Sequence, residues 1–149
     1  MTFRYAFTSV KDAGKDLPIF VYYHGGGFFG GGPDIVEQMC MLLVQKLDCV
    51  ALNVDYRFCP ESHYPHPVDD CWAATRWAYE NAEKLGADAN KLAVRGDSAG
   101  GNLAAVISLK DRDEGTNMVK LQVLLYTLWS TLPASIRSFT TALTRVSTA

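Results

Sequence analysis

Long apolar runs without charge are missing from this sequence of 149 residues. Residues 1–16, MTFRYAFTSVKDAGKD, contain no apolar core of the kind that a signal peptide carries. No later run is long and uncharged enough to span a bilayer. We therefore expect a cytoplasmic protein without a membrane span.

An excess of positive charge is missing as well. The formal net charge is -2, and the 14 Lys and Arg residues are scattered rather than gathered in a basic stripe. Such a chain cannot neutralise a phosphate backbone, so nucleic acid is excluded as a partner and a small neutral ligand fits better. With 48% hydrophobic residues, the sequence predicts one soluble globular domain with a sizeable core.

Paired cysteines are the third absence. The four cysteines, Cys40, Cys49, Cys59 and Cys71, form no C-x-x-C pair. This spacing argues against a zinc knuckle and against a redox motif. We expect reduced, half-buried thiols, with no metal and no organic cofactor, while the oligomeric state stays open.

Short apolar runs and amphipathic segments alternate along the chain. Runs rich in β-branched and aromatic residues predict buried strands at 17–23, 49–56, 91–98 and 121–127. Segments with helical period lie between them, at 33–47, at about 67–85 with Gly86 as terminator, and at about 99–110. This alternation predicts an α/β fold, a three-layer α/β/α sandwich around a mostly parallel sheet.

Each helix is expected to bury one stripe of side chains. The first stripe is Ile35, Val36, Met39, Cys40, Leu43, Val44 and Leu47. The second is Val68, Trp72, Thr75, Tyr79, Ala82 and Leu85, and the third is Leu103, Val106 and Ile107.

A G-x-S-x-G pattern, GDSAGG at 96–101, lies where a predicted strand meets a predicted helix. A serine in such a sharp turn can be a nucleophile, because the turn pushes its Oγ outward. Gly96 and Gly100 leave room for that turn. The alternative is a glycine-rich turn in which Ser98 merely caps the following helix.

A second pattern, HGGGFFGGG at 24–32, directly follows the first predicted strand. Glycines there let backbone N–H groups point at a developing oxyanion without obstruction by side chains. A phosphate-binding loop is disfavoured, because no Lys-Ser/Thr follows and the spacing does not fit a dinucleotide fingerprint. Two independent patterns thus indicate acyl transfer, and His24 is expected to brace the loop rather than to act as a base.

Together these motifs resemble the hormone-sensitive-lipase-like branch of the α/β-hydrolases, which includes bacterial esterases and arylacetamide deacetylases. The likeness covers about 17–126: H-G-G-G at 24–27, Y-R-x-x-P-E at 56–61, D-C-x-x-A-x-x-W at 70–77 and G-D-S-A-G-G-N at 96–102. It implies a single partial α/β-hydrolase domain over 1–149, with a core at 17–127 and an unaligned tail at 130–149. The G-D-S-G-G of trypsin-like proteases is a poorer match, since those proteins are all-β and 99–110 has helical period.

What the resemblance implies is hydrolysis of a small-molecule carboxylic ester, with Ser98 as the nucleophile. The oxyanion would accept backbone N–H groups from Gly26, Gly27 and Ala99. Residues expected to support the site are His24, Gly25, Gly96, Asp97, Gly100 and Asn102. Tyr56, Arg57 and Glu61 are expected to hold the loop after their strand.

The catalytic base is not found where the family places it. In α/β-hydrolases the triad runs Ser, then Asp or Glu, then His, but the three histidines of this chain all precede Ser98. The later acids, Asp111, Asp113 and Glu114, are expected to form a solvated helix end. The sequence therefore predicts a truncated esterase that is catalytically incomplete as given. The alternative is a non-catalytic relative that binds a ligand or a partner, as plant gibberellin receptors do.

The family topology also predicts how the strands are ordered. We expect the spatial order second, first, third, fourth, all parallel, with Ser98 at the carboxyl end of the third strand. Without the family's later strands, 121–127 would form an open apolar edge. A poorly soluble or marginally stable chain is expected on that basis.

Overall fold

The computed structural model describes residues 4–8, 16–127 and 142–145, without the side chains of the first and last strands. The described strands form one sheet in the order β1-β3-β2-β4-β5-β6. Their bounds are β1 Arg4–Thr8, β2 Leu17–Tyr23, β3 Val50–Asp55, β4 Ala87–Asp97, β5 Val119–Leu125 and β6 Ala142–Arg145.

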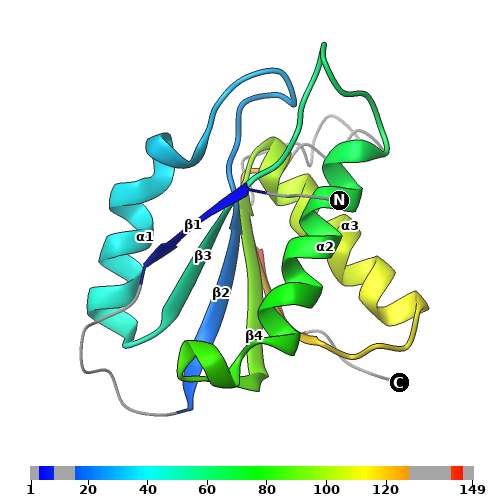
Figure 1. Ribbon diagram of the computed structural model, residues 1–149. Helices are drawn as coiled ribbons and strands as arrows, with labels where there is room; N and C mark the ends of the chain where they lie inside the picture. Colours follow the sequence, from blue (N-terminus) through cyan, green and yellow to red (C-terminus); the bar gives the residue numbers. More distant parts are fainter. Residues whose placement is uncertain (1–3, 9–15, 128–141, 146–149) are drawn as a thin grey trace.

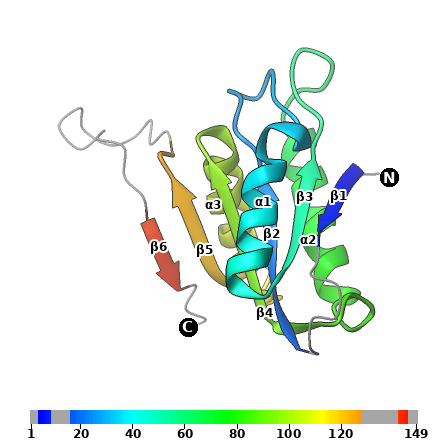
Figure 2. The ribbon, with the colours of Figure 1, turned by 90° about the vertical axis from the view of Figure 1, so that its left-hand side faces the viewer.

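Helices cover both faces of this sheet, which confirms the predicted three-layer α/β/α architecture. Helix α1, Pro33–Leu47, lies on one face, while α2, His66–Glu80, and α3, Ala99–Asp113, lie on the other (Figure 1; Figure 2). Within the described part of the chain, no helix has both the length and the apolar character needed to cross a bilayer.

The predicted strand order is confirmed for the four central strands. β3, β2, β4 and β5 lie side by side, and each neighbouring pair is parallel. Two further strands were not predicted: β1 pairs antiparallel with β3, and β6 pairs antiparallel with β5 (Figure 2). The expectation of an open edge at 121–127 is therefore wrong, because β6 hydrogen-bonds along β5 from Leu121 to Leu124.

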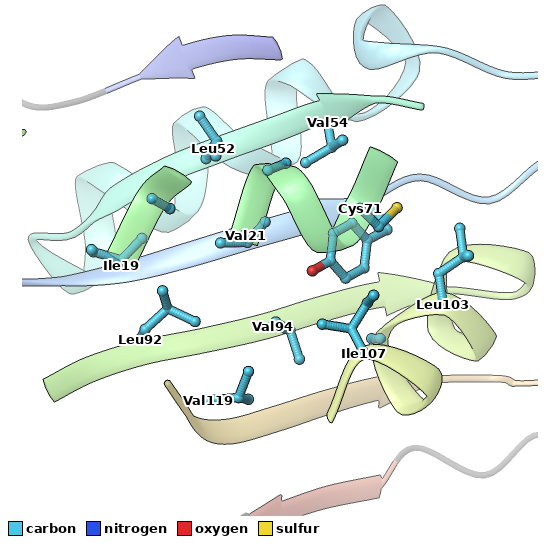
Figure 3. Packing of buried hydrophobic residues seen from close by; sticks show 14 of the residues in the cluster. Ile19, Val21, Leu52, Val54, Cys71, Leu92, Val94, Leu103, Ile107 and Val119 are labelled. Atoms are coloured by element: carbon cyan, nitrogen blue, oxygen red, sulfur yellow. The ribbon is translucent and has the colours of Figure 1, made fainter. Parts of the chain in front are cut away.

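The main core lies between the sheet and the α2/α3 layer. Alternate residues of β2, such as Ile19 and Val21, point toward these helices and pack with Leu92 and Val94 of β4 (Figure 3). The intervening Tyr22 points to the other face, where it belongs to a smaller cluster under α1. Burial on both faces explains why the central strands are continuous apolar runs.

The buried stripe of α1 is narrower than predicted. Val36, Cys40 and Val44 are buried, whereas Ile35 is 73% exposed and Leu47 is 51% exposed. Only the residues at every fourth position, Val36, Cys40 and Val44, therefore face the sheet.

The second predicted helix differs in both its length and its buried face. Helix α2 ends at Glu80, and a separate 3₁₀ turn at Glu83–Leu85 leads to Gly86, whose φ is 70°. The small residues Cys71, Ala74 and Ala78 contact the core, while Trp72 and Tyr79 are only partly buried beside it. Small side chains let the helix lie close to the sheet, which a pattern based on the largest residues does not reveal.

The buried thiols under α1 predict a loss of stability at alkaline pH. Burial raises the pKa of both Cys40 and Cys49 from an ordinary value of 9.0 to about 11. The contribution of these neutral thiols to the free energy of unfolding is complete below the pKa of the unfolded state. It is lost as the pH rises through the pKa of the folded state. We expect the free energy of unfolding in urea to fall by about 1–3 kcal/mol between pH 9 and 11 from this source.

The matched control for this prediction is the double variant Cys40→Ala/Cys49→Ala. Whatever its absolute stability, its urea stability should change less over the same pH range. An unchanged pH slope would show that other groups cause the loss.

Candidate active site

Ser98 connects β4 directly to α3 in a strained conformation. Its φ is 51° and its ψ is -117°, an unusual combination for a residue with a Cβ. The residue occupies the N-cap position of α3, yet its side chain makes no capping hydrogen bond. Its backbone N–H donates to the oxygen of Leu125 at 2.9 Å. The structure therefore argues against the capping interpretation and leaves Oγ free of the helix.

Close backbone contacts require the two glycines that flank the turn. A Cβ built on Gly96 would lie 2.1 Å from the oxygen of Gly100. A Cβ built on Gly100 would lie 1.9 Å from the oxygen of Tyr23, at the end of β2. The first turn of α3 thus rests directly on the carboxyl ends of two neighbouring strands.

The glycine loop after β2 presents free backbone donors. Gly26 has φ 125° and Gly27 has φ 64°, values that favour glycine. The oxygen of Gly26 accepts the N–H groups of Phe29 and Gly30, which closes a tight turn. No acceptor among the described residues takes the N–H of Gly26 or Gly27. Ala99 opens α3, where the first N–H groups have no carbonyl one turn earlier.

Asp97 holds the glycine loop against the serine turn. Its Oδ1 accepts the N–H of Gly25 at 3.2 Å and the hydroxyl of Tyr22 at 2.9 Å. Burial and the negative charge of Asp97 raise the pKa of Tyr22 well above its usual range, so the phenol remains a donor. A Cβ on Gly25 would lie 2.3 Å from Oδ2 of Asp97, so the loop approaches this carboxylate closely.

His24 is a buried part of the loop and is 1% exposed. Its ring stacks on Tyr56 with centroids 4.3 Å apart, and its Nδ1 lies 2.7 Å from the oxygen of Gly25. Its backbone oxygen accepts the hydroxyl of Tyr56 at 2.6 Å. These contacts fix the ring between β3 and the glycine loop.

An ion pair anchors the loop after β3. The Nε and Nη2 atoms of Arg57 donate to the two oxygens of Asp70, each at 2.7 Å, and Asp70 is 2% exposed. The same loop reaches the glycine loop, because the N–H of Cys59 donates to the oxygen of Phe28 at 2.7 Å. Sequence reasoning assigned Arg57 a supporting role but did not identify its partner.

A pocket of about 300 Å³ lies beside the serine turn. Its lining comes from the glycine loop, the loop after β3, α2 and α3. The lining residues are Phe28, Cys59, Tyr64, Pro67, Val68, Asn102, Leu103 and Val106. Val106, which was predicted to face the core, is instead 40% exposed at this pocket. Sequence reasoning missed the pocket because its walls come from separate segments.

One of the acids after Ser98 is not solvated. Asp111 is 1% exposed and accepts the N–H groups of Met118 and Val119 at 3.0 Å, so the predicted solvated helix end is wrong for this residue. Asp113 and Glu114 are exposed, as expected.

The other two histidines lie in the segment between β3 and α2. His63 Nδ1 lies 3.8 Å from Sγ of Cys59, and His66 begins α2 with an exposed side chain. All four cysteines are free. In the ranges that the structure describes, no three His, Cys, Asp or Glu side chains are arranged to hold a metal ion.

Known proteins share both the sequence and the fold of this chain. A family model described as alpha/beta hydrolase fold matches residues 20–147, a range that extends past residue 126, where the motif likeness ends, and into the tail at 130–149. The esterase LipI of Mycobacterium tuberculosis is 44% identical over 116 residues, which are 76% of this chain and 36% of LipI.

Two solved structures give the same result. EstE1, a thermostable carboxylesterase from a metagenomic library, matches with a TM-score of 0.83 and 42% identity over 89% of this chain and 46% of EstE1. The esterase of Pyrobaculum calidifontis matches with a TM-score of 0.81 and 44% identity over 85% of this chain and 40% of that one. The chain spans about a third of the length of the curated relatives that it matches.

Proposed function

Since this chain belongs to the α/β hydrolase fold family, in its hormone-sensitive-lipase-like esterase branch, we propose that it carries the nucleophile and oxyanion-binding part of a carboxylic-ester hydrolase. Ser98 is the proposed nucleophile. The observation that supports this most is its strained, uncapped position between β4 and α3, next to a glycine loop with free N–H groups.

In the proposed reaction, Oγ of Ser98 attacks the carbonyl carbon of a small ester. The electrons of the C=O bond move onto the oxygen. This oxygen accepts hydrogen bonds from the backbone N–H groups of Gly26, Gly27 and Ala99. These donors are held in place before the reaction by the Gly25–Asp97 hydrogen bond and by the start of α3. Fixed donors stabilise the developing charge without a cost of reorganisation. The adjoining pocket would take the hydrocarbon part of the ester.

The proton of Ser98 also needs an acceptor. None of the three histidines follows Ser98 in the sequence, His24 is stacked on Tyr56, and His63 lies against Cys59. We propose that the 149-residue chain is catalytically incomplete as given.

Turnover by the purified chain is therefore expected to be very weak. Hydrolysis of p-nitrophenyl butyrate should rise barely above the background rate, and Ser98→Ala should change that rate little. An oxyanion hole without a triad retains roughly 10³–10⁴ over water, which is far below normal catalysis. Robust turnover abolished by both Ser98→Ala and His66→Ala would contradict this, because the chain would then have assembled a base.

A labelling experiment tests the role of Ser98 itself. We expect a p-nitrophenyl alkylphosphonate to modify Ser98 in the native chain at least about tenfold faster than in the chain unfolded in urea, because the oxyanion donors are positioned only in the fold. Peptide mass spectrometry locates the adduct. Ser98→Ala should remove it, and Ser62→Ala is the matched control that should keep it. Equal labelling rates in the native and the unfolded chain would contradict the assignment of Ser98 as the nucleophile.

The second candidate is a non-catalytic relative that binds a small apolar ligand. It is favoured by the positions of the histidines, none of which is shown in contact with Ser98. Such a protein would bind the ligand in the pocket with unchanged affinity in Ser98→Ala. It would also show no fold-dependent phosphonate adduct.

A further inference from the structure

The pocket wall contains a thiol that the proposed ester chemistry does not use. Sγ of Cys59 lies 3.8 Å from Nδ1 of His63 and 3.5 Å from the oxygen of Ser62. The imidazole is solvent-exposed, and the thiol is partly exposed and lines the apolar pocket. A nucleophile, a neighbouring proton acceptor and an apolar cavity thus meet at one place.

The other three cysteines lack this combination. Cys40, Cys49 and Cys71 are buried, and burial raises the pKa of each thiol. A thiol reacts as its thiolate, so these residues are both covered and held in the unreactive form. Cys59 alone among the four is partly accessible.

We propose that Cys59 and His63 form a covalent-modification site that takes apolar α,β-unsaturated carbonyl compounds through the adjoining pocket. His63 Nδ1 accepts the thiol proton, and Sγ forms a bond to the β-carbon of the compound. The electron pair of the C=C bond moves toward the carbonyl and gives an enolate. The α-carbon then takes the proton back from His63. The step is a net addition with no leaving group and no co-reactant.

The pocket determines which compounds this site prefers. Phe28, Val68, Leu103 and Val106 supply apolar walls. A volume of about 300 Å³ lies at the lower end of the range of small-ligand pockets, which suits a compact apolar group such as benzyl. Binding there places the C=C bond beside Sγ and raises its effective concentration.

An adduct would also occupy the pocket that we assign to the ester. Phe28 of the glycine loop lines the same pocket as Cys59, so the modified side chain would lie against that loop. The modification site rests on the pocket and on the Cys59–His63 contact, and it does not require Ser98 to be a nucleophile.

The test compares benzyl acrylate with iodoacetamide on the full 149-residue chain at pH 7.5, followed by peptide mass spectrometry. We expect a single benzyl acrylate adduct, on Cys59, that forms at least about tenfold faster than with glutathione. Iodoacetamide is too small to bind in the pocket, so the ratio of its rate with Cys59 to its rate with glutathione should be clearly smaller. Cys59→Ser should abolish the adduct, and His63→Gln should slow both reagents.

The variant Val106→Trp distinguishes the contribution of the pocket to the reaction rate from that of the thiol. Val106 is 40% exposed on α3, so a larger side chain can fill the pocket without entering the core. In the Val106→Trp variant, Cys59 should react about tenfold more slowly with benzyl acrylate and at an unchanged rate with iodoacetamide. Adducts that form equally fast on the buried cysteines, no preference for benzyl acrylate, or equal effects of Val106→Trp on both reagents would each overturn the proposal.

Discussion

Gly100→Ala is expected to lower the free energy of unfolding by about 3–5 kcal/mol, although alanine favours a helix over glycine by about 1 kcal/mol. The new Cβ would lie 1.9 Å from the oxygen of Tyr23 and 2.6 Å from the oxygen of His24. Both are backbone atoms, one at the last residue of β2 and one at the residue after it, and they cannot rotate away, so α3 would have to move off the sheet. Urea unfolding followed by circular dichroism measures the loss.

Gly32→Ala is the matched control. A Cβ at Gly32 meets nothing within 4 Å, and the residue has an extended φ of 167° at the N-cap of α1. Its stability should change by less than about 1 kcal/mol. Equal losses in the two variants would show that the serine turn is not packed as closely on β2 as the structure has it.

Asp111→Ala is expected to lower the free energy of unfolding by a similar amount, about 3–5 kcal/mol, for an electrostatic reason. The carboxylate accepts the N–H groups of Met118 and Val119 at 3.0 Å each, and it also accepts the hydroxyl of Thr116 at 2.6 Å. Its removal leaves buried donors at the start of β5 without an acceptor. The urea midpoint should fall sharply while the denaturant slope stays unchanged.

Asp113→Ala provides the comparison on the same helix. Asp113 is exposed and pairs with its neighbour Arg112 at 2.7 Å. Pairs of this kind contribute about 0–1 kcal/mol, so this variant should unfold almost like the parent. If both aspartates cost equally little, Asp111 does not hold β5 to α3.

The central strands were predictable because burial on both faces leaves an unmistakable apolar run, as in residues 17–23. The two edge strands were not. Arg4–Thr8 and Ala142–Arg145 are short and carry no such run. β1 pairs with β3 rather than with the next strand, and β6 pairs with the strand before it, β5. Edge strands are defined by their partner, which a local pattern does not contain.

The candidate site shows the same division. The motifs placed Ser98 and the glycine loop, because a strand-to-helix junction can be recognised locally. Asp111 was misinterpreted, because an acid near the end of a helix is usually solvated and nothing nearby indicates that β5 returns to it. The contact between Cys59 and His63 likewise depends on how one loop folds back on itself.

The position of β2 in the sheet has a consequence for synthesis on the ribosome. β2 ends at Tyr23, but its partner β4 begins only at Ala87. At about 5–20 residues per second, the nascent chain exposes an apolar strand for several seconds before that partner exists. During this interval β3 can pair with one edge of β2, but the edge that β4 occupies in the folded protein stays open. Chaperone binding to the segment around β2 would therefore protect the nascent chain during the period in which aggregation competes most strongly with folding.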